Sequence, residues 1–481
     1  MGIQGLLPFI KSSIDSDYHI EKLRGKRVAV DGYAWLHKAS YGCCEELCTG
    51  IPTKKWIDYC VRLIDMLLFF QIDVTMVFDG ADLPAKKATE IERGKNRKLN
   101  LDKGIELKSR GDRDGSRMYF SRAVNVTPYM AAQLIHHLKT NRPTVKCVVA
   151  PYEADAQLAY LSINNIVDAI IAEDSDTIPF GCKEIIFKLE QNGKCERLLL
   201  SNLFQLCTKG VDLIDFTHDM IVSMCIGAGC DYLDSLKNIG IKNSYKYVSK
   251  HKSVDKVLRT MRLHGLLPLN VVKTINIGDE KISVLEYEVN FYKAFLTFRH
   301  QVVYDVVSQR TCYLNPINFN ELPHSICSHP SSATEADVSF LGSNLDSTLA
   351  SSIANGLVDP ITHKAFTFEG SVKQNTPCNK NNDKFASQKI DKAVKSQMNY
   401  GIMNHFSVKS TVENKVAPVY HNNKIEAVRQ NLPSTKPLAS IPIKPEVASG
   451  NKISSFFKKK VISPAESLAC LLYTSPSPRD S

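Results

Sequence analysis

Short runs of apolar and β-branched residues recur through the first part of the chain and predict β-strands. The runs cover residues 26–31, 73–79, 145–150, 167–172 and 184–187. Between them, segments such as residues 56–70 carry an apolar residue about every 3.6 positions, as in a helix packed on one face. Strands that alternate with helices form mostly parallel sheets covered on both faces. We therefore expect an α/β fold in which helices flank a mostly parallel central sheet.

Residues 80–130 interrupt this alternation because they are charged, helix-prone and almost free of strand-like runs. Nine basic and four acidic residues lie between positions 86 and 110. We expect an inserted helical element here. Residues 214–300 also have a helical pattern, and the small residues around Gly240 predict a hairpin of two helices in which Gly240 supplies the tight turn.

The composition changes after about residue 370, where Asn, Ser, Lys and Gln dominate and aromatic residues become rare. Such a segment cannot bury enough apolar surface to offset its loss of entropy, so we expect residues 361–469 to be a disordered basic tail. Residues 371–460 hold 16 Lys or Arg and 5 Asp or Glu, whereas residues 1–370 hold 43 of each. Residues 470–481 look like a translated sequencing adapter, and we expect the natural C-terminus to be missing.

The composition also argues against membrane and secreted proteins. No uncharged apolar stretch of about 18 residues occurs, so no membrane span is expected. The N-terminus has no basic segment before its short apolar run, so no signal peptide is expected. The 14 cysteines are scattered, which is typical of buried thiols in the cytosol or nucleus. A zinc or disulfide role for Cys43, Cys44 and Cys48 stays open.

Seven carboxylates stand at the ends of predicted strands and are the candidate reactive groups. Functional groups collect at the carboxyl ends of strands in such sheets, where the charges would repel one another unless cations held them together. Mg²⁺ prefers oxygen ligands, and two such ions can clamp both oxygens of an in-line phosphoryl displacement. Any single residue could instead be a helix N-cap, but the close pairs favour a metal site and hence a nuclease. The seven are Asp31, Asp79, Glu153, Asp155, Asp174, Asp176 and Asp231.

Basic and aromatic residues supply further candidates. Lys86, Arg93 and Arg97 of the insert could form a solvated helix face, or they could bind the scissile phosphate beside the metals. Tyr33 and His37 are four positions apart and share one helix face, where they could stack on a base or pack in the core. The nearby Trp35 is expected in the core.

The predicted helical hairpin is a candidate contact for the DNA backbone. Its second helix would offer N–H groups to a phosphate, which is a contact independent of base sequence. An ordinary structural turn is an equally good interpretation. The candidate contacts are Ser235, Ile239, Gly240 and Lys242.

The tail contains Ile453, Phe456 and Phe457 in a pattern similar to a sliding-clamp-binding peptide, with Gly450 in the place of its glutamine. Short apolar motifs also arise by chance in such tails. The lysines at 458–460 could serve nuclear import or DNA tethering.

The chain resembles the structure-specific 5′ nucleases of the flap endonuclease superfamily, from residue 1 to about residue 360. The marks are Met-Gly-Ile-Gln-Gly-Leu-Leu, Val-Ala-Val-Asp31, Val-Phe-Asp79-Gly, Ala-Glu-Asp174-Ser-Asp176 and Gly-Cys-Asp231-Tyr. The resemblance implies an N-terminal nuclease region over residues 1–99 with the start of a helical arch, and the rest of the arch over 100–130. It also implies an internal nuclease region over 131–360, with a helix–two-turn–helix near 226–250.

The resemblance also implies the role of each candidate. The seven carboxylates would hold two Mg²⁺ ions, for which Mn²⁺ can substitute, and Lys86, Arg93 and Arg97 of the arch would meet the scissile phosphate. Tyr33 and His37 would lie near the frayed 5′ end. The helix–two-turn–helix would bind the uncut strand around a K⁺ ion, and Asn238 stands where the family usually has Gly.

The function implied is 5′→3′ degradation of one strand of duplex DNA, with cutting of 5′ flaps, in the nucleus. Mismatch repair, recombination and end resection are the expected settings, with a sliding clamp and mismatch-repair proteins as expected partners. One alternative is a flap or junction endonuclease with little exonuclease activity. Another is a catalytically dead DNA-binding scaffold, against which the intact carboxylate set argues.

Overall fold

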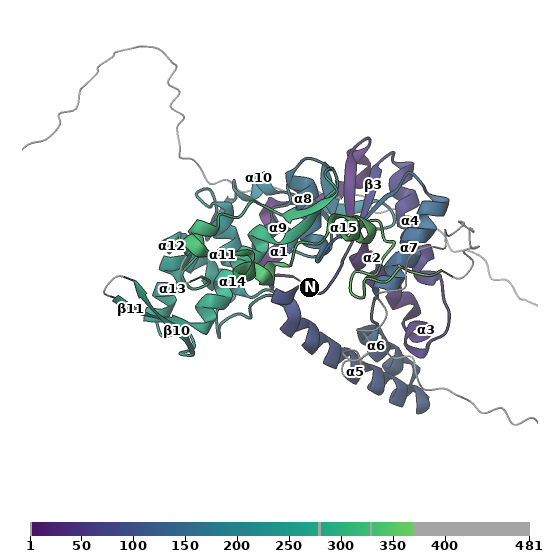
Figure 1. The fold of residues 1–481 in the computed structure, drawn as a ribbon. Coiled ribbons are helices and arrows are strands. Elements are labelled where there is room, and N and C mark those ends of the chain that lie inside the picture. Colours follow the sequence, from purple (N-terminus) through teal and green to yellow (C-terminus); the bar gives the residue numbers. More distant parts are fainter. Residues whose placement is uncertain (1, 278–279, 328–329, 369–481) are drawn as a thin grey trace, which may run out of the picture. The chain divides into compact units, whose positions relative to one another are not determined.

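The central sheet has seven strands, most of them parallel (Figure 1). The computed structural model describes residues 2–277, 280–327 and 330–368. The strand order is β1-β7-β6-β5-β2-β3-β4, in which β2 to β6 pair in parallel and β7 and β1 pair antiparallel. The bounds are β1 Ile14–His19, β2 Arg27–Asp31, β3 Asp73–Phe78, β4 Lys146–Val149, β5 Ala169–Ile171, β6 Glu184–Phe187 and β7 Lys194–Leu199. The predicted mostly parallel α/β sheet is confirmed, and β1 and β7 are additions to it.

Helices cover both faces of the sheet because the strands are apolar on both sides. In β2, Val28 and Val30 belong to the core of one face, and Ala29 belongs to the core of the other. All three are fully buried. The first face is covered by α2 (Gly32–Ser40), α4 (Lys55–Phe69) and α7 (Pro128–Asn141). The second is covered by α8 (Ala154–Ile163), α11 (His218–Ala228) and α14 (Glu286–His300).

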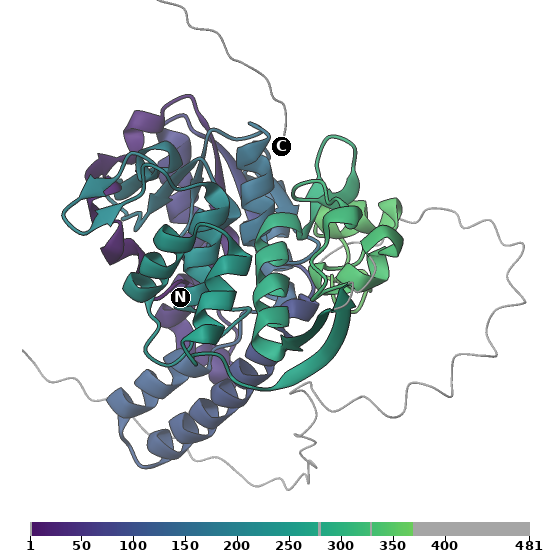
Figure 2. The ribbon, with the colours of Figure 1, turned by 90° about the vertical axis from the view of Figure 1, so that its left-hand side faces the viewer.

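The predicted helical insert is a pair of helices that projects away from the sheet (Figure 1, Figure 2). α5 (Lys87–Ser109) follows the short 3-10 turn η4 (Pro84–Lys86) and packs against α6 (Arg113–Ala123). Gly104 allows the close approach, because a Cβ there would lie 2.7 Å from the Phe120 ring. Phe120 also packs on Cys44 of α3 (Cys44–Thr49), and this contact anchors the insert to the body.

The expectation of helices throughout residues 214–300 is wrong in one place. α11, α12 (Ile241–His251), α13 (Val254–Leu263) and α14 are helices, but β10 (Val271–Ile277) and β11 (Glu280–Leu285) form an antiparallel hairpin between them. Five of the seven residues of β10 are β-branched, and such residues favour strands because their χ1 angle is restricted in helices. The signal was therefore present in the sequence.

The described chain ends in a short sheet and a helix. β12 (Val302–Asp305) pairs with β13 (Arg310–Tyr313), and α15 (Ser347–Ala354) follows. Beyond α15, Phe366 and Phe368 lie against Tyr129 and His136 of α7. The shorter elements are α1 (Leu6–Phe9), α9 (Thr177–Phe180), α10 (Leu200–Leu203), β8 (Cys207–Thr208) and β9 (Val211–Asp212).

Three expectations concern membrane spans, cysteines and the tail. Within the described residues, no helix is both long and apolar enough to cross a membrane. The described cysteines are free thiols, and those at positions 43 and 44 are buried. The predicted clamp motif of Ile453, Phe456 and Phe457 lies outside the described residues.

Candidate active site

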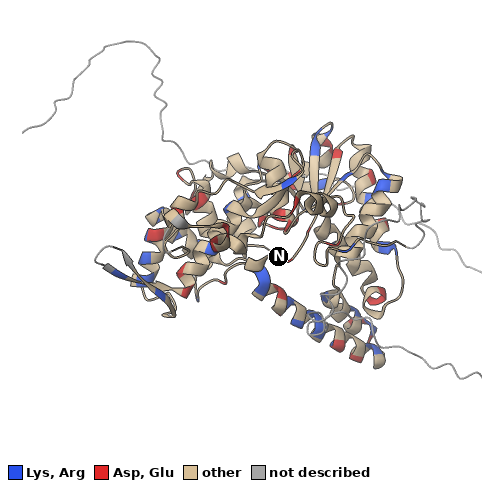
Figure 3. Ribbon diagram, in the orientation of Figure 1, with Lys and Arg blue, Asp and Glu red and all other residues tan. Residues whose placement is uncertain are grey.

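Six of the seven candidate carboxylates follow four neighbouring parallel strands. In the sheet these strands are adjacent in the order β5, β2, β3 and β4. Their carboxyl ends therefore lie at one edge, which is where functional groups collect in such sheets. Figure 3 shows acidic positions at this edge, near the start of α5. The six are Asp31 at the end of β2, Asp79 after β3, Glu153 and Asp155 after β4, and Asp174 and Asp176 after β5.

Asp231 reaches the same place by a different route. The expectation that it ends a strand is wrong, because it follows α11 and lies in a turn closed by a bridge between Cys230 and Leu233. Its carboxylate nevertheless meets the base of the insert. Thr89 Oγ1 of α5 donates a hydrogen bond to the Asp231 carbonyl oxygen over 2.9 Å.

Burial and mutual repulsion disfavour ionisation of the clustered carboxylates. Burial, followed by the charge of Asp79, raises the pKa of Asp31 to about 7. Burial raises the pKa of Asp79 to about 6. The pKa values of Asp155 and Asp176 are raised well above the ordinary range, first by burial and then by the charge of Asp174. The cluster therefore needs positive charge in order to be ionised at neutral pH.

Two side chains of the insert supply such charge. Lys86 Nζ lies 2.6 Å from Glu153 Oε1 and 2.7 Å from Asp231 Oδ2. Arg93 Nη2 lies 2.8 and 2.9 Å from the two carboxylate oxygens of Asp231. Burial favours a raised pKa for Asp231, but Lys86 and Arg93 outweigh it and the pKa is lowered. Arg97 lies farther along α5, 4.0 Å from Glu90.

The chemistry of the cluster fits a divalent metal ion. The Oδ1 atoms of Asp155 and Asp176 are buried and have no hydrogen-bond partner among the described residues. The available donors are carboxylate oxygens, which Mg²⁺ prefers. Within the described ranges, no three His, Cys, Asp or Glu side chains are already arranged as ligands of one ion. The ammonium of Lys86 instead lies between Glu153 and Asp231, so metal binding at these two residues requires Lys86 to move.

Tyr33 and His37 of α2 have different charged neighbours. Burial and the charge of Asp79 raise the pKa of Tyr33. The pKa of His37 is lowered by burial and then by Arg97 and Arg93, which places this ring beside α5. Tyr33 thus lies near Asp79 and His37 lies near the insert, while Trp35 on the same helix is buried, as predicted.

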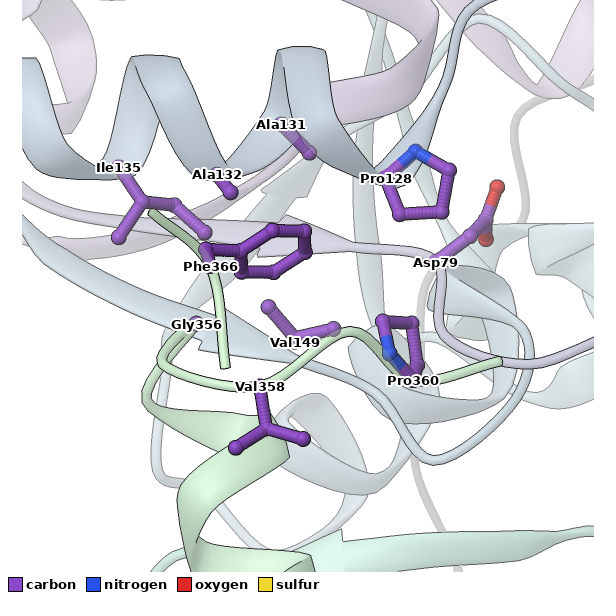
Figure 4. A pocket seen from close by; sticks show the side chains of 10 residues that line it. All are labelled: Asp79, Pro128, Ala131, Ala132, Ile135, Val149, Gly356, Val358, Pro360 and Phe366. Carbon is purple, nitrogen blue, oxygen red and sulfur yellow. The ribbon is translucent and has the colours of Figure 1, made fainter. Parts of the chain in front are cut away.

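Asp79 also borders a small pocket formed by the end of the described chain (Figure 4). Pro128 of α7 and Pro360 lie beside Asp79, and Phe366 lies between α7 and Val358. This approach of residues 356–366 to the site was not expected from the sequence.

The turn between α11 and α12 differs from the prediction in its backbone. Gly240 has a φ of −99° and is the N-cap of α12, so it does not supply the tight turn. The left-handed positions are Gly229, with a φ of 99°, and Asn238, with a φ of 65°. Asparagine tolerates this conformation better than most residues, which explains how it can replace glycine at position 238.

The predicted DNA contacts at this turn line a groove of about 770 Å³. Ile239 is only 5% exposed and packs mainly in the core. Residues of the N-terminal segment, which the sequence did not indicate as contacts, also line it. The lining includes Gln4, Phe9, Ser235, Ile239, Gly240 and Lys242.

Sequence reasoning missed other contacts at the carboxylates. Tyr232 donates a hydrogen bond from its hydroxyl to Glu153 Oε2 over 2.5 Å. The N-terminal segment lies against the site, since Ile3 N donates to Ser175 Oγ over 2.9 Å. Gly2 has a φ of 84°, and a Cβ there would lie 1.8 Å from Asp174 Oδ1, so only glycine fits. Gly2 lies within the Met-Gly-Ile-Gln-Gly motif, which was the signal available for this segment.

Two family models match the regions that carry the site. Residues 1–100 match the model described as the XPG N-terminal domain, and residues 144–231 match the XPG I-region. The first match includes Asp31, Asp79 and Lys86, and the second includes the remaining five carboxylates.

Curated relatives match a larger part of the chain. Exonuclease 1 of Oryza sativa subsp. japonica is 40% identical over 367 residues, which cover 76% of this chain and 40% of that protein. Exonuclease 1 of Arabidopsis thaliana is 39% identical over 77% of this chain and 46% of that protein. Exodeoxyribonuclease 1 of Schizosaccharomyces pombe is 35% identical over 78% of this chain and 60% of that protein. The chain thus spans about half the length of the curated relatives it matches.

Among solved structures, flap endonuclease-1 from Methanococcus jannaschii is 20% identical, with a TM-score of 0.37. The alignment covers 55% of this chain and 80% of that chain. This level of similarity adds nothing to the assignment.

Proposed function

The chain belongs to the XPG family of nucleases, in the branch of exonuclease 1, and from this premise we propose that it is a Mg²⁺-dependent 5′→3′ exonuclease. It would degrade one strand of duplex DNA and also cut 5′ flaps. The observation that carries the proposal is the gathering of buried carboxylates at one edge of the sheet, beside the cationic base of the insert.

Each group of site residues has a separate role in the proposed reaction. Bound divalent ions would stabilise the negative charge that develops on the phosphate. Lys86 and Arg93 would exchange their carboxylate partners for the scissile phosphate. Tyr33, near Asp79, and His37, near the insert, would stack on terminal bases after these bases unpair, which costs a few kcal/mol.

The groove at the turn before α12 would hold the uncut part of the duplex. Its wall includes the first residues of α12, whose N–H groups can meet a backbone phosphate. Ser235 and Lys242 would add polar and charged contacts, and a K⁺ ion at this turn is part of the proposal.

The proposed setting is DNA repair in the nucleus. Mn²⁺ would substitute for Mg²⁺, and mismatch-repair proteins and a sliding clamp would be partners. The clamp would bind through Ile453, Phe456 and Phe457, in the part of the sequence that the structure does not describe.

A strand-resolved digestion of an end-labelled, 5′-recessed duplex tests the proposal. The wild type is assayed with Mg²⁺ and with EDTA, next to Asp174→Ala and a matched control, Asp168→Ala. Both aspartates flank β5, but Asp168 lies before the strand and pairs with Arg27 at 2.8 Å. We expect Asp174→Ala to abolish cleavage and to leave duplex binding largely intact, and Asp168→Ala to digest normally.

The proposed exonuclease activity is supported if nucleotides are lost stepwise from the 5′ end and this loss requires Mg²⁺ and Asp174. Normal digestion by Asp174→Ala would contradict the assigned role of the carboxylates. If recessed ends stay intact while 5′ flaps or four-way junctions are cut, the protein is a flap or junction endonuclease.

A further inference from the structure

Tyr232 holds one side of the Glu153 carboxylate. Its hydroxyl binds Glu153 Oε2 at 2.5 Å, and Lys86 binds Oε1 at 2.6 Å. Glu153 is only 9% exposed, so water has little access to this carboxylate. A phosphate in the site would compete for Lys86, but it would not compete for the uncharged hydroxyl of Tyr232. Tyr232 is therefore the contact of Glu153 that can persist when substrate is bound.

The ring of Tyr232 belongs to a row of three aromatic side chains. It meets the ring of Phe298 of α14 nearly at a right angle, with centroids 5.0 Å apart. Phe298 meets Phe180 of α9 in a similar way, also at 5.0 Å. Phe180 and Phe298 are fully buried. Because α9 begins directly after Asp176, the row connects the segment of Asp231 with the segment of Asp176 through the core.

We propose that Tyr232 is a positioning residue of the candidate metal site. Its hydroxyl orients the Glu153 carboxylate, and its ring fixes the neighbouring Asp231 against α14. A carboxylate that is already oriented loses less rotational freedom when it binds a cation, and removal of such a partner typically costs roughly 10–100-fold in metal affinity. The inference rests on the proposed function, because that function assigns cation binding to Glu153 and Asp231.

The test compares Tyr232→Phe with Tyr287→Phe in the full chain. Tyr287 is also a buried tyrosine, 7% exposed, but its hydroxyl has no hydrogen-bond partner among the described residues. Binding of Mn²⁺ without DNA is measured by electron paramagnetic resonance, and the Mg²⁺ dependence of duplex digestion is measured in parallel. We expect Tyr232→Phe to weaken Mn²⁺ binding and to raise the half-saturating Mg²⁺ concentration by about tenfold or more. We expect Tyr287→Phe to match the wild type.

A double variant separates positioning from a general loss of structure. If Tyr232 acts through Glu153, Tyr232→Phe adds little to the loss of Mn²⁺ affinity already caused by Glu153→Gln. The proposal is overturned if Tyr232→Phe lowers the Mn²⁺ affinity of the Glu153→Gln variant as much as it lowers that of the wild type. It is also overturned if the single variant Tyr232→Phe has an unchanged Mn²⁺ affinity, or if its cleavage rate is lowered equally at all Mg²⁺ concentrations.

The two proposals fail in different ways. If Tyr232→Phe weakens Mn²⁺ binding but the wild type cleaves no DNA, the positioning role stands and the nuclease function falls. If the wild type cleaves DNA and Tyr232→Phe has the same Mg²⁺ dependence, the function stands and the positioning role falls.

Discussion

Removal of the charge of Asp31 is expected to stabilise the protein in the absence of divalent cations. Burial, followed by the charge of Asp79, raises the pKa of Asp31 from its ordinary value of 3.8 to about 7. The folded state has the higher pKa, so the free-energy cost of ionisation is absent below about pH 4, grows up to about pH 7 and is constant above it. A shift of about 3 units, at about 1.4 kcal/mol each, gives a cost of about 4 kcal/mol at pH 8 and about 2 kcal/mol at pH 5.

Asp31→Asn is a suitable probe because it keeps the helix cap. Asp31 Oδ1 accepts a hydrogen bond from Ala34 N at 3.0 Å, and asparagine caps helices about equally well. Unfolding by guanidinium in EDTA, at pH 8 and pH 5, measures the free energy of unfolding. We expect a gain of up to about 4 kcal/mol at pH 8 and a smaller gain at pH 5.

The control for this prediction is Asp112→Asn. Asp112 caps α6 through Gly115 N at 2.9 Å but is exposed, so we expect a change below about 0.5 kcal/mol. Mg²⁺ should stabilise the wild type more than Asp31→Asn. The reasoning is refuted if Asp31→Asn is no more stable than the wild type at pH 8, or if its gain is the same at both pH values.

Two other substitutions test the insert and the turn. Lys86→Ala should slow single-turnover cleavage by about 100-fold, because it removes a cation near the phosphate, and should weaken duplex binding much less. Equal losses in a gel-shift assay and in the cleavage rate would contradict this role. Asn238→Ala should lower the free energy of unfolding in urea by about 1 kcal/mol, because alanine lacks the short polar side chain that helps asparagine adopt a φ of 65°, whereas Asn238→Gly should not. Equal stability of the two variants would show that this φ carries no cost.

The sheet and six of the carboxylates could be predicted because their signals are local. Each of the four strands that carries them contains a short apolar or β-branched run, and the acid follows within a few positions. Parallel pairing then brings the strand ends together without any further information. The position of Asp31 at the end of β2, next to Asp79 after β3, is an example.

The rest of the site depends on contacts between residues far apart in the chain. Asp231 follows a helix, and Tyr232 binds Glu153 across 79 positions, so no local pattern indicates either contact. The turn at Asn238 could be predicted only in part. Gly240, two residues later, suggested the turn, but the left-handed conformation belongs to Asn238. The turn type decides which residue adopts this conformation.

The position of Lys86 links the charge balance of the site to its proposed chemistry. The Lys86 side chain is 17% exposed, and its ammonium donates to both Glu153 and Asp231. These contacts occupy two of its three N–H donors, so only one donor is left for a phosphate while both contacts are kept. With a divalent cation on those two carboxylates, Lys86 would lose its partners and become available to the substrate. In the proposed function, cation binding and release of Lys86 toward the phosphate would therefore be coupled, and by reciprocity a phosphate that holds Lys86 would favour cation binding.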